Sequence, residues 1–380
     1  MTSRMIDRRT MLAGGIALSA LAPAASLARR AGTGLRPDPR PDLRIALLGQ
    51  SLIQQDVCAA PWPGRAGIAA LLKPADAVFT DLETAILSPA AGAPTRQGEV
   101  LHAAPPVVID CLCGLGVSIV ATSNNHAWDL GTAGIGATLA ELDARHIFHA
   151  GSGLDLASAS MAAVQPTRHG GVALVAAAAG AIRDGAAATP ARAGVNELRR
   201  AADGALEPTD VARALDAIST ARRQGNTVIA YLHNHYWEKD PAATPEWQRA
   251  YARQCIDAGA AIFVAHGPTL LQGIERYKGA PLLHGLGSLI FQTRKTGDAY
   301  GPANWQSLIV DARFRNRAFV GAQITPVLLD ESRATPGAEY TKGMPAIARG
   351  DDGRSICRHV AEMSARMNCE IVMRGDSIML

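Results

Sequence analysis

The chain has 380 residues, 48% of them hydrophobic, so it can bury a substantial core in one large domain or two ordinary ones. Its net charge is +3, from 37 Lys and Arg against 34 Asp and Glu, and only 4% of its residues are aromatic. This composition lacks the basic footprint and the aromatic stacking surface of nucleic-acid-binding proteins, so we expect no nucleic-acid partner.

The N-terminus has the pattern of a twin-arginine export signal. Arg8 and Arg9 precede an apolar run from Met11 to Leu21, and small residues follow as far as Ala28, after which we expect cleavage. A short membrane anchor is the alternative, but the run is well below the ~20 apolar residues that a spanning helix needs. The sequence therefore predicts a periplasmic or extracellular protein without a permanent membrane anchor.

After a predicted signal peptide over residues 1–28 and a Pro/Arg-rich linker over 29–42, apolar strand patterns alternate with helical ones. The predicted strands cover residues 44–49, 76–83, 116–123, 170–178, 226–233 and 260–266. The predicted helices cover residues 132–146, 208–225 and 244–259. This alternation indicates an α/β fold with a largely buried sheet.

From about Gln272 the pattern becomes hairpin-like, with turn signals at Lys278-Gly279 and Arg315-Asn316. We therefore expect an antiparallel second half. The predicted main domain covers residues 43–330, and residues 331–380 are predicted to be a C-terminal extension with a short helix and a final strand.

The six cysteines are too scattered for a zinc knuckle, and Cys111-Leu112-Cys113 is one residue short of CxxC. In an oxidising compartment Cys357 could pair with Cys369, whereas most of the others are expected to be buried free thiols.

Polar residues recur where the predicted strands end. In open α/β sheets the carboxyl ends of strands direct side chains into a common crevice. The residues that fall at such positions are Gln50, Asp81, Glu83, Asn124, Asn125, His126, His233, His235 and His266.

Each of these residues also has a simpler interpretation. Asp81 and Glu83 could form a solvated edge, and the two asparagines are ordinary turn formers. Asp129 could cap the helix that begins near Thr132. A single His-x-His pair, such as His233 and His235, is weak support for a metal. The recurrence of polar residues at several strand ends is what favours a common site.

Carboxylate, carboxamide and imidazole groups together suit a hydrolytic divalent ion such as Mn²⁺, Zn²⁺ or iron. An ion of this kind makes hydroxide available near neutral pH. Asn125 would offer a carbonyl ligand, His126 would act as general acid, and Asp129 would orient its imidazole.

Three segments resemble the CapA family of poly-γ-glutamate capsule synthesis proteins. They are DLETAIL, ATSNNHAWDLGTAGIGATLAELDARHIFHAGSG and QCIDAGAAIFVAHGPTLLQGIERYKGAPLLHGLGSLIF, and the similarity covers roughly residues 44–295. The resemblance implies a four-layer αββα sandwich of the calcineurin-like metallophosphoesterase type. It also implies metal or catalytic roles for Glu83, Asn125, His126, His233 and His266.

The departures from that family's pattern concern its metals. Gln50 replaces an aspartate, and Gly267 and Thr269 replace imidazoles of the family's GHHPH motif. His235, which is extra in the HNH sequence, could compensate for one lost imidazole. The resemblance therefore implies one metal ion rather than two.

Other catalytic templates are missing from the sequence. No phosphate-binding Gx₄GK[ST] loop is present, and no serine has the GxSxG context. Two hypotheses follow. The first is an exported metal-dependent hydrolase of the cell envelope that acts on poly-γ-glutamate or a related anionic polymer or ester. The second is a non-catalytic polymer-binding or assembly protein with a degenerate metal site.

Overall fold

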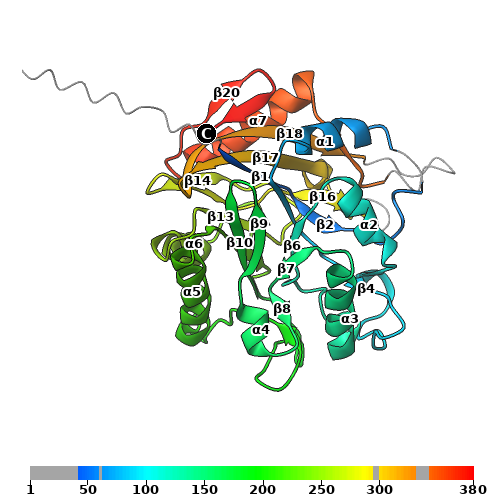
Figure 1. Cartoon of the computed structure of the whole chain (residues 1–380). Helices are drawn as coiled ribbons and strands as arrows, with labels where there is room; N and C mark the ends of the chain where they lie inside the picture. Colours follow the sequence, from blue (N-terminus) through cyan, green and yellow to red (C-terminus); the bar gives the residue numbers. More distant parts are fainter. Residues whose placement is uncertain (1–41, 60–61, 294–298, 331–341) are drawn as a thin grey trace, which may run out of the picture. The chain divides into compact units, whose positions relative to one another are not determined.

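Two β-sheets pack face to face in the computed structural model (Figure 1), which describes residues 42–59, 62–293, 299–330 and 342–380. The predicted signal peptide and nearly all of the predicted linker lie outside the described residues. The first sheet has the strand order β20-β21-β18-β17-β1-β3-β6-β7, and β19 also pairs with β18. Its strands are β1 (Leu43–Leu47), β3 (Ala77–Asp81), β6 (Ile119–Ala121), β7 (Phe148–Ala150), β17 (Gln306–Arg315), β18 (Ala318–Leu329), β19 (Pro345–Ile347), β20 (Val372–Arg374) and β21 (Ser377–Met379).

The second sheet has the strand order β14-β15-β13-β12-β10-β9. Its strands are β9 (Ala163–Thr167), β10 (Gly170–Ala179), β12 (Thr227–Asn234), β13 (Ile262–His266), β14 (Ile274–Tyr277) and β15 (Ala280–Leu283). Strands β1, β3, β6 and β7 are parallel to one another in the first sheet, as are β10, β12, β13 and β15 in the second. Three short pairs complete the strands: β2 (Gln50–Leu52) with β16 (Ser288–Phe291), β4 (Ala85–Ile86) with β5 (Ala103–Ala104), and β8 (Ser152–Gly153) with β11 (Gly194–Val195).

Alternation of side chains along the strands explains the layers. Ile45 and Phe79 of the first sheet share a buried cluster with Leu174 and Ile229 of the second, so these faces meet. The intervening residues of each strand point the other way and need a cover of helices. The helices are α1 (Arg65–Leu72), α2 (Val107–Gly114), α3 (Gly131–Asp143), α4 (Leu156–Ser160), α5 (Pro208–Arg223), α6 (Glu246–Asp257) and α7 (Gly350–Ala365).

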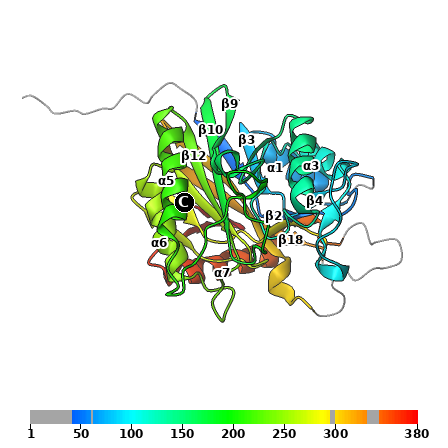
Figure 2. The ribbon, with the colours of Figure 1, turned by 90° about the horizontal axis from the view of Figure 1, so that it is seen from below.

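Helices cover the outer face of both sheets. Apolar residues of α1 and α2 pack on Ala46 and Val78 of the first sheet. Those of α5 and α6 pack on Val175 and Val228 of the second. Figure 2 shows α5 and α6 on one side of the molecule and α1 and α3 on the other. The α/β class and the four-layer αββα sandwich are therefore confirmed.

The C-terminal segment adds to both the sheet and the core. Strands β19 and β21 pair with β18, and α7 contributes Ile356 and Val360 to the cluster between the sheets. The predicted short helix is α7, and the predicted final strand is a hairpin of β20 and β21. Residues 331–341 lie outside the described residues.

The predicted elements agree with the structure to within a few residues. The predicted hairpin turn at Lys278-Gly279 is confirmed, because these residues join β14 to β15. The second predicted turn, Arg315-Asn316, is one residue early: Arg315 ends β17 and pairs with Ala318, so Asn316 and Arg317 form the turn to β18. Lys278 and Asn316 both have positive φ, as a tight turn requires. All six cysteines lie in described residues and are free thiols in the structure.

Candidate metal centre

The carboxyl ends of two parallel strands from each sheet bring the predicted polar residues together. Asp81 is the last residue of β3, and His266 is the last of β13. His233 lies one residue before the end of β12, directly opposite His266 in the sheet register. Asn124 and Asn125 follow β6. Each strand is a mainly apolar, buried run, and its polar residues stand at or just beyond its carboxyl end, where the ends of the two sheets meet.

The nitrogen and oxygen donors of three side chains converge on one point. One ligand atom each from Glu83, His233 and His235 lies within 4.8 Å of the others. His233 Nε2 is 3.0 Å from His235 Nε2 and 3.7 Å from Glu83 Oε1. Asn125 Oδ1 lies 2.9 Å from the same nitrogen of His233. Two imidazoles, a carboxylate and a carboxamide oxygen thus surround one small volume.

Asp81 lies on the opposite side of the His233 ring. Its Oδ2 is 3.1 Å from His233 Nδ1, and its Oδ1 accepts a hydrogen bond from Asn124 Nδ2 at 3.0 Å. This arrangement orients the His233 ring and leaves Nε2 directed at Glu83 and Asn125, which is how a carboxylate commonly supports a metal-binding histidine. The sequence grouped Asp81 with the ligands, whereas the structure places it behind one of them.

His266 and Gln50 lie outside this trio. His266 Nδ1 is 3.2 Å from the Tyr231 hydroxyl, which is itself 3.4 Å from His233 Nδ1. His266 Nε2 is buried without a hydrogen-bond partner. Gln50 Oε1 accepts a hydrogen bond from the Gly267 backbone N–H at 3.0 Å. Gln50 thus connects the start of β2 to the turn after β13.

Gly267 and Thr269, which replace imidazoles of the family's motif, have structural roles in this chain. Gly267 has φ +135°, and a Cβ there would lie 1.9 Å from the Asn234 carbonyl oxygen. The backbone of this chain therefore cannot hold a histidine at position 267 without moving. Thr269 Oγ1 donates a hydrogen bond to Asn304 Oδ1 at 2.6 Å.

His126 and Asp129 form a pair beside the trio. His126 Nδ1 is 2.8 Å from Asp129 Oδ2, and that oxygen also accepts the His102 backbone N–H at 2.9 Å. The Asn124 side chain accepts the backbone N–H of His126 at 3.1 Å, which fixes the turn. The alternative that Asp129 caps the following helix is wrong, because the N-cap of α3 is Leu130 and has no side-chain cap.

The electrostatics of the cluster follow from burial. Burial raises the pKa of Asp81 to about 7, against the opposing effects of His266 and Asn124. Burial, with Asp81 and Asp129 nearby, raises the pKa of Glu83 well above its usual value. Burial also lowers the pKa of His233 and of His266 to about 3, so both imidazoles are neutral. Neutral imidazoles beside carboxyl groups whose ionisation is opposed by burial suit a bound cation, because the cation would stabilise the ionised carboxylates.

Sequence reasoning missed two arginines. Arg96 Nε and Arg183 Nη2 lie 2.9 Å and 3.1 Å from the same oxygen of Asp129. Arg183 also stacks on Trp128, with 5.1 Å from its guanidinium carbon to the ring centroid. Arg183 follows β10, so the rule of strand ends could have found it. Arg96 lies in a loop with no recognisable pattern.

A sequence profile described as bacterial capsule synthesis protein PGA_cap matches residues 44–293. That is about two thirds of the chain. The chain belongs to this capsule synthesis family. The matched range includes Gln50, Glu83, Asn125, His126, Asp129, His233, His235 and His266.

The chain is similar to proteins whose names refer to polyglutamine or PGA synthesis. An uncharacterised protein of Sinorhizobium fredii is 28% identical over 66% of this chain and 67% of its own. A Mycobacterium tuberculosis protein named "probable polyglutamine synthesis accessory protein" is 30% identical over 60% of this chain and 59% of its own. The Bacillus subtilis PGA biosynthesis protein CapA is 25% identical over 60% and 55%. No helix among the described residues of this capsule synthesis family member has the length and apolar character to cross a membrane.

Proposed function

We propose that the chain is an exported, metal-dependent hydrolase-type protein of the cell envelope that acts on poly-γ-glutamate or a related anionic polymer or ester. The observation that carries this proposal is the convergence of Glu83, His233 and His235 with the Asn125 oxygen, beside the His126–Asp129 pair. Membership of the capsule synthesis family supports the polymer as the substrate class.

The donor set fits one divalent cation of the Mn²⁺, Zn²⁺ or iron type. Glu83 Oε2 is buried and has no hydrogen-bond partner. His233 and His235 point their Nε2 atoms at each other, and two neutral imidazoles in that geometry can share at most one hydrogen. Glu83, His233, His235 and Asn125 would hold the ion, which would supply Lewis-acid activation of water and substrate. His266 lies beside His233 in the sheet, and its buried, unpartnered Nε2 is a further nitrogen that could bind a metal.

His126 is positioned to move a proton. Its Nδ1 donates to the Asp129 carboxylate, which fixes the tautomer and leaves Nε2 as the nitrogen that exchanges a proton with a substrate. Burial lowers the pKa of His126, while Asp129 opposes that effect. Asp129 is a positioning residue in this scheme, because it acts through the imidazole.

The two arginines support an anionic substrate. Both guanidiniums share the single carboxylate of Asp129, so one positive charge beside His126 is left without a partner on that carboxylate. Their side chains are 16% and 28% exposed, so a phosphate or carboxylate group could reach them.

Turnover tests the proposal. The purified chain, loaded with Mn²⁺ or Zn²⁺, should hydrolyse a generic phosphodiester or shorten poly-γ-glutamate, and chelation should abolish the activity. The variant His233→Ala should be inactive, whereas His359→Ala, which changes an exposed histidine of α7, should match the parent.

A binding or assembly role is the second candidate function. The substitutions at Gln50, Gly267 and Thr269 favour it, because none of these residues is free to bind a metal. The side chains of Gln50 and Thr269 are used in hydrogen bonds, and the backbone at Gly267 leaves no space for a side chain. Metal binding without turnover of either substrate, together with retention of poly-γ-glutamate by the purified chain, would establish this role and contradict hydrolysis.

Export rests on the twin arginine, which lies outside the described residues. Changing Arg8 and Arg9 to Lys should keep the chain in the cytoplasm, as fractionation of an expressing bacterium would show. Undiminished export of that variant would remove the twin-arginine route from the proposal.

A further inference from the structure

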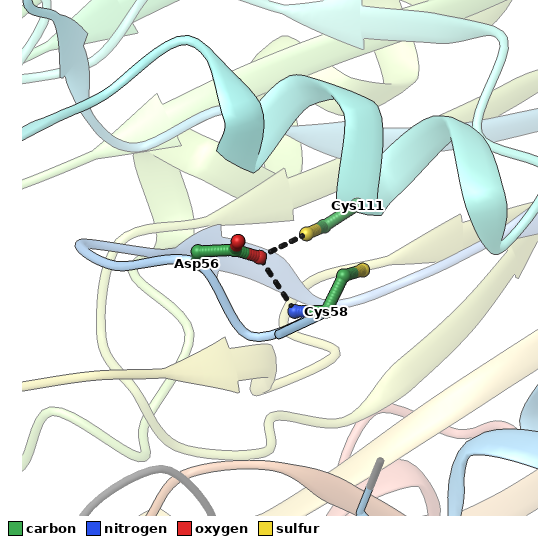
Figure 3. Close-up of side chains that lie close together, drawn as sticks. All are labelled: Asp56, Cys58 and Cys111. Carbon is green, nitrogen blue, oxygen red and sulfur yellow. Dashed lines mark hydrogen bonds between the residues drawn. The ribbon is translucent and has the colours of Figure 1, made fainter. Parts of the chain in front are cut away.

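A second cluster of possible ligands lies in another part of the fold. The loop after β2 carries Asp56 and Cys58, and α2 carries Cys111 (Figure 3). One ligand atom from each of the three lies within 4.8 Å of the other two. The cluster shares no residue with the candidate metal centre, so it does not depend on the proposed function.

Asp56 is the centre of this cluster. Its Oδ1 accepts the backbone N–H groups of Cys58 at 2.9 Å and Ala59 at 3.1 Å, which fixes the loop. The same oxygen accepts a hydrogen bond from Cys111 Sγ at 3.2 Å. Figure 3 marks this contact with a dashed line. Cys111 is 1% exposed, whereas Asp56 and Cys58 are half-buried. The cluster therefore has a closed side on α2 and an open side on the loop.

A disulfide between the two thiols would not account for the carboxylate. A cation can replace the thiol protons and use all three side chains at once.

We propose that Asp56, Cys58 and Cys111 bind a thiophilic divalent cation of the zinc class. Two sulfurs and one carboxylate oxygen are a ligand set that zinc accepts, and a water at the open side completes four-coordination. Binding releases the two thiol protons to solvent. The ion fastens the loop after β2 to α2, two segments more than fifty residues apart in the chain.

Cobalt substitution tests this site directly, because thiolate ligands give Co²⁺ a sulfur-to-metal charge-transfer absorption that oxygen and nitrogen ligands do not. The reduced chain, titrated with Co²⁺, should show this band, and added Zn²⁺ should remove it. Cys58→Ser should lose the band at a cobalt concentration that saturates the parent. Cys113→Ser, which changes a half-buried thiol of α2 that is outside the cluster, should keep it.

Cys58 is the better residue to replace, because it is half-buried in a loop. Its replacement by serine leaves the buried Cys111 in place on α2. His233→Ala should leave the band unchanged and so separate this site from the candidate metal centre. No charge-transfer band in the reduced parent, or an equal band in Cys58→Ser, would overturn the proposal. A Cys58–Cys111 disulfide in the non-reduced chain, with no band after reduction, would do so as well.

Discussion

At the scale of single residues, His126 is the side chain whose role is easiest to isolate. It touches Asp129 but is not one of the three side chains whose ligand atoms converge. We predict that His126→Ala lowers the turnover of a phosphodiester or of poly-γ-glutamate by about 10²- to 10⁴-fold, the usual contribution of a general acid. Bound metal, measured by elemental analysis, should stay at the parental level. Unchanged turnover would remove His126 from the mechanism.

Substitutions at Gln50 test whether the chain can be made to bind a second metal ion. Its side chain is 1% exposed and accepts the Gly267 N–H. Gln50→Asp would restore an anionic oxygen at this strand end, so we predict a higher metal content per chain than in the parent. Gln50→Asn, a neutral residue of the same length as Asp, is the matched control and should not change it. Equal metal content in both variants would show that Gln50 does not stand at a ligand position.

At the scale of elements, a buried ion-pair network joins β14 to α6. Glu275 is 4% exposed and receives hydrogen bonds from Arg249 at 2.9 Å and Arg253 at 2.6 Å. Although burial acts to raise it, the nearby His284 and the hydrogen bonds from Arg249 and Arg253 hold the pKa of Glu275 at about 2. The ionised carboxylate therefore stabilises the folded chain.

We predict that Glu275→Gln lowers the free energy of unfolding by about 3 kcal/mol near pH 7, because it removes a buried carboxylate and leaves the half-buried guanidiniums of Arg249 and Arg253 short of a partner. The difference from the parent should be full above the usual glutamate pKa of 4.5 and should shrink as the pH falls from there through about 2. Urea unfolding at several pH values measures it. Glu246→Gln is the control, since Glu246 contacts the same arginines but is 69% exposed, and it should cost less than about 1 kcal/mol. A pH-independent difference would contradict this reading.

The individual helices, strands and turns could be predicted from the sequence. Apolar runs such as residues 170–178 and 226–233 carry a local signal, and so do the turn residues Lys278 and Asn316, because period and backbone conformation are properties of neighbouring residues. Pairing between distant segments is not local. The return of β21 to the edge of β18, and the packing of α7 against the core between the sheets, could not be read from the sequence.

For the candidate metal centre too, the sequence predicted which residues lie near one another but not how their side chains are oriented. The rule that functional residues gather at strand ends indicated Glu83, Asn125 and His233 correctly as neighbours. It could not decide which side of the His233 ring Asp81 would take, or whether His235 or His266 would join Glu83. Those choices depend on side-chain orientation in the assembled sandwich. Arg96 reaches Asp129 from a loop, a contact that no periodicity encodes.

At the scale of the whole molecule, the two sheets make the centre possible. Glu83 and Asn125 follow strands of the first sheet, while His233 and His235 come from the end of β12 in the second. The shared core of Ile45, Phe79, Leu174 and Ile229 fixes the sheets against each other. The candidate centre therefore requires the assembled sandwich, and a ligand bound there would stabilise the folded state by mass action.

Metal content of the folded chain is the most direct test of the claim that Glu83, Asn125, His233 and His235 together hold a cation. The measurement uses a chain carrying Cys58→Ser, so that the Asp56–Cys58–Cys111 cluster does not contribute. After loading with Mn²⁺ or Zn²⁺ and desalting, we predict about one ion per chain in this parent and in its His359→Ala variant. His233→Ala should lose that ion. A parent without bound metal, or a His233→Ala variant that retains it in full, would contradict the account.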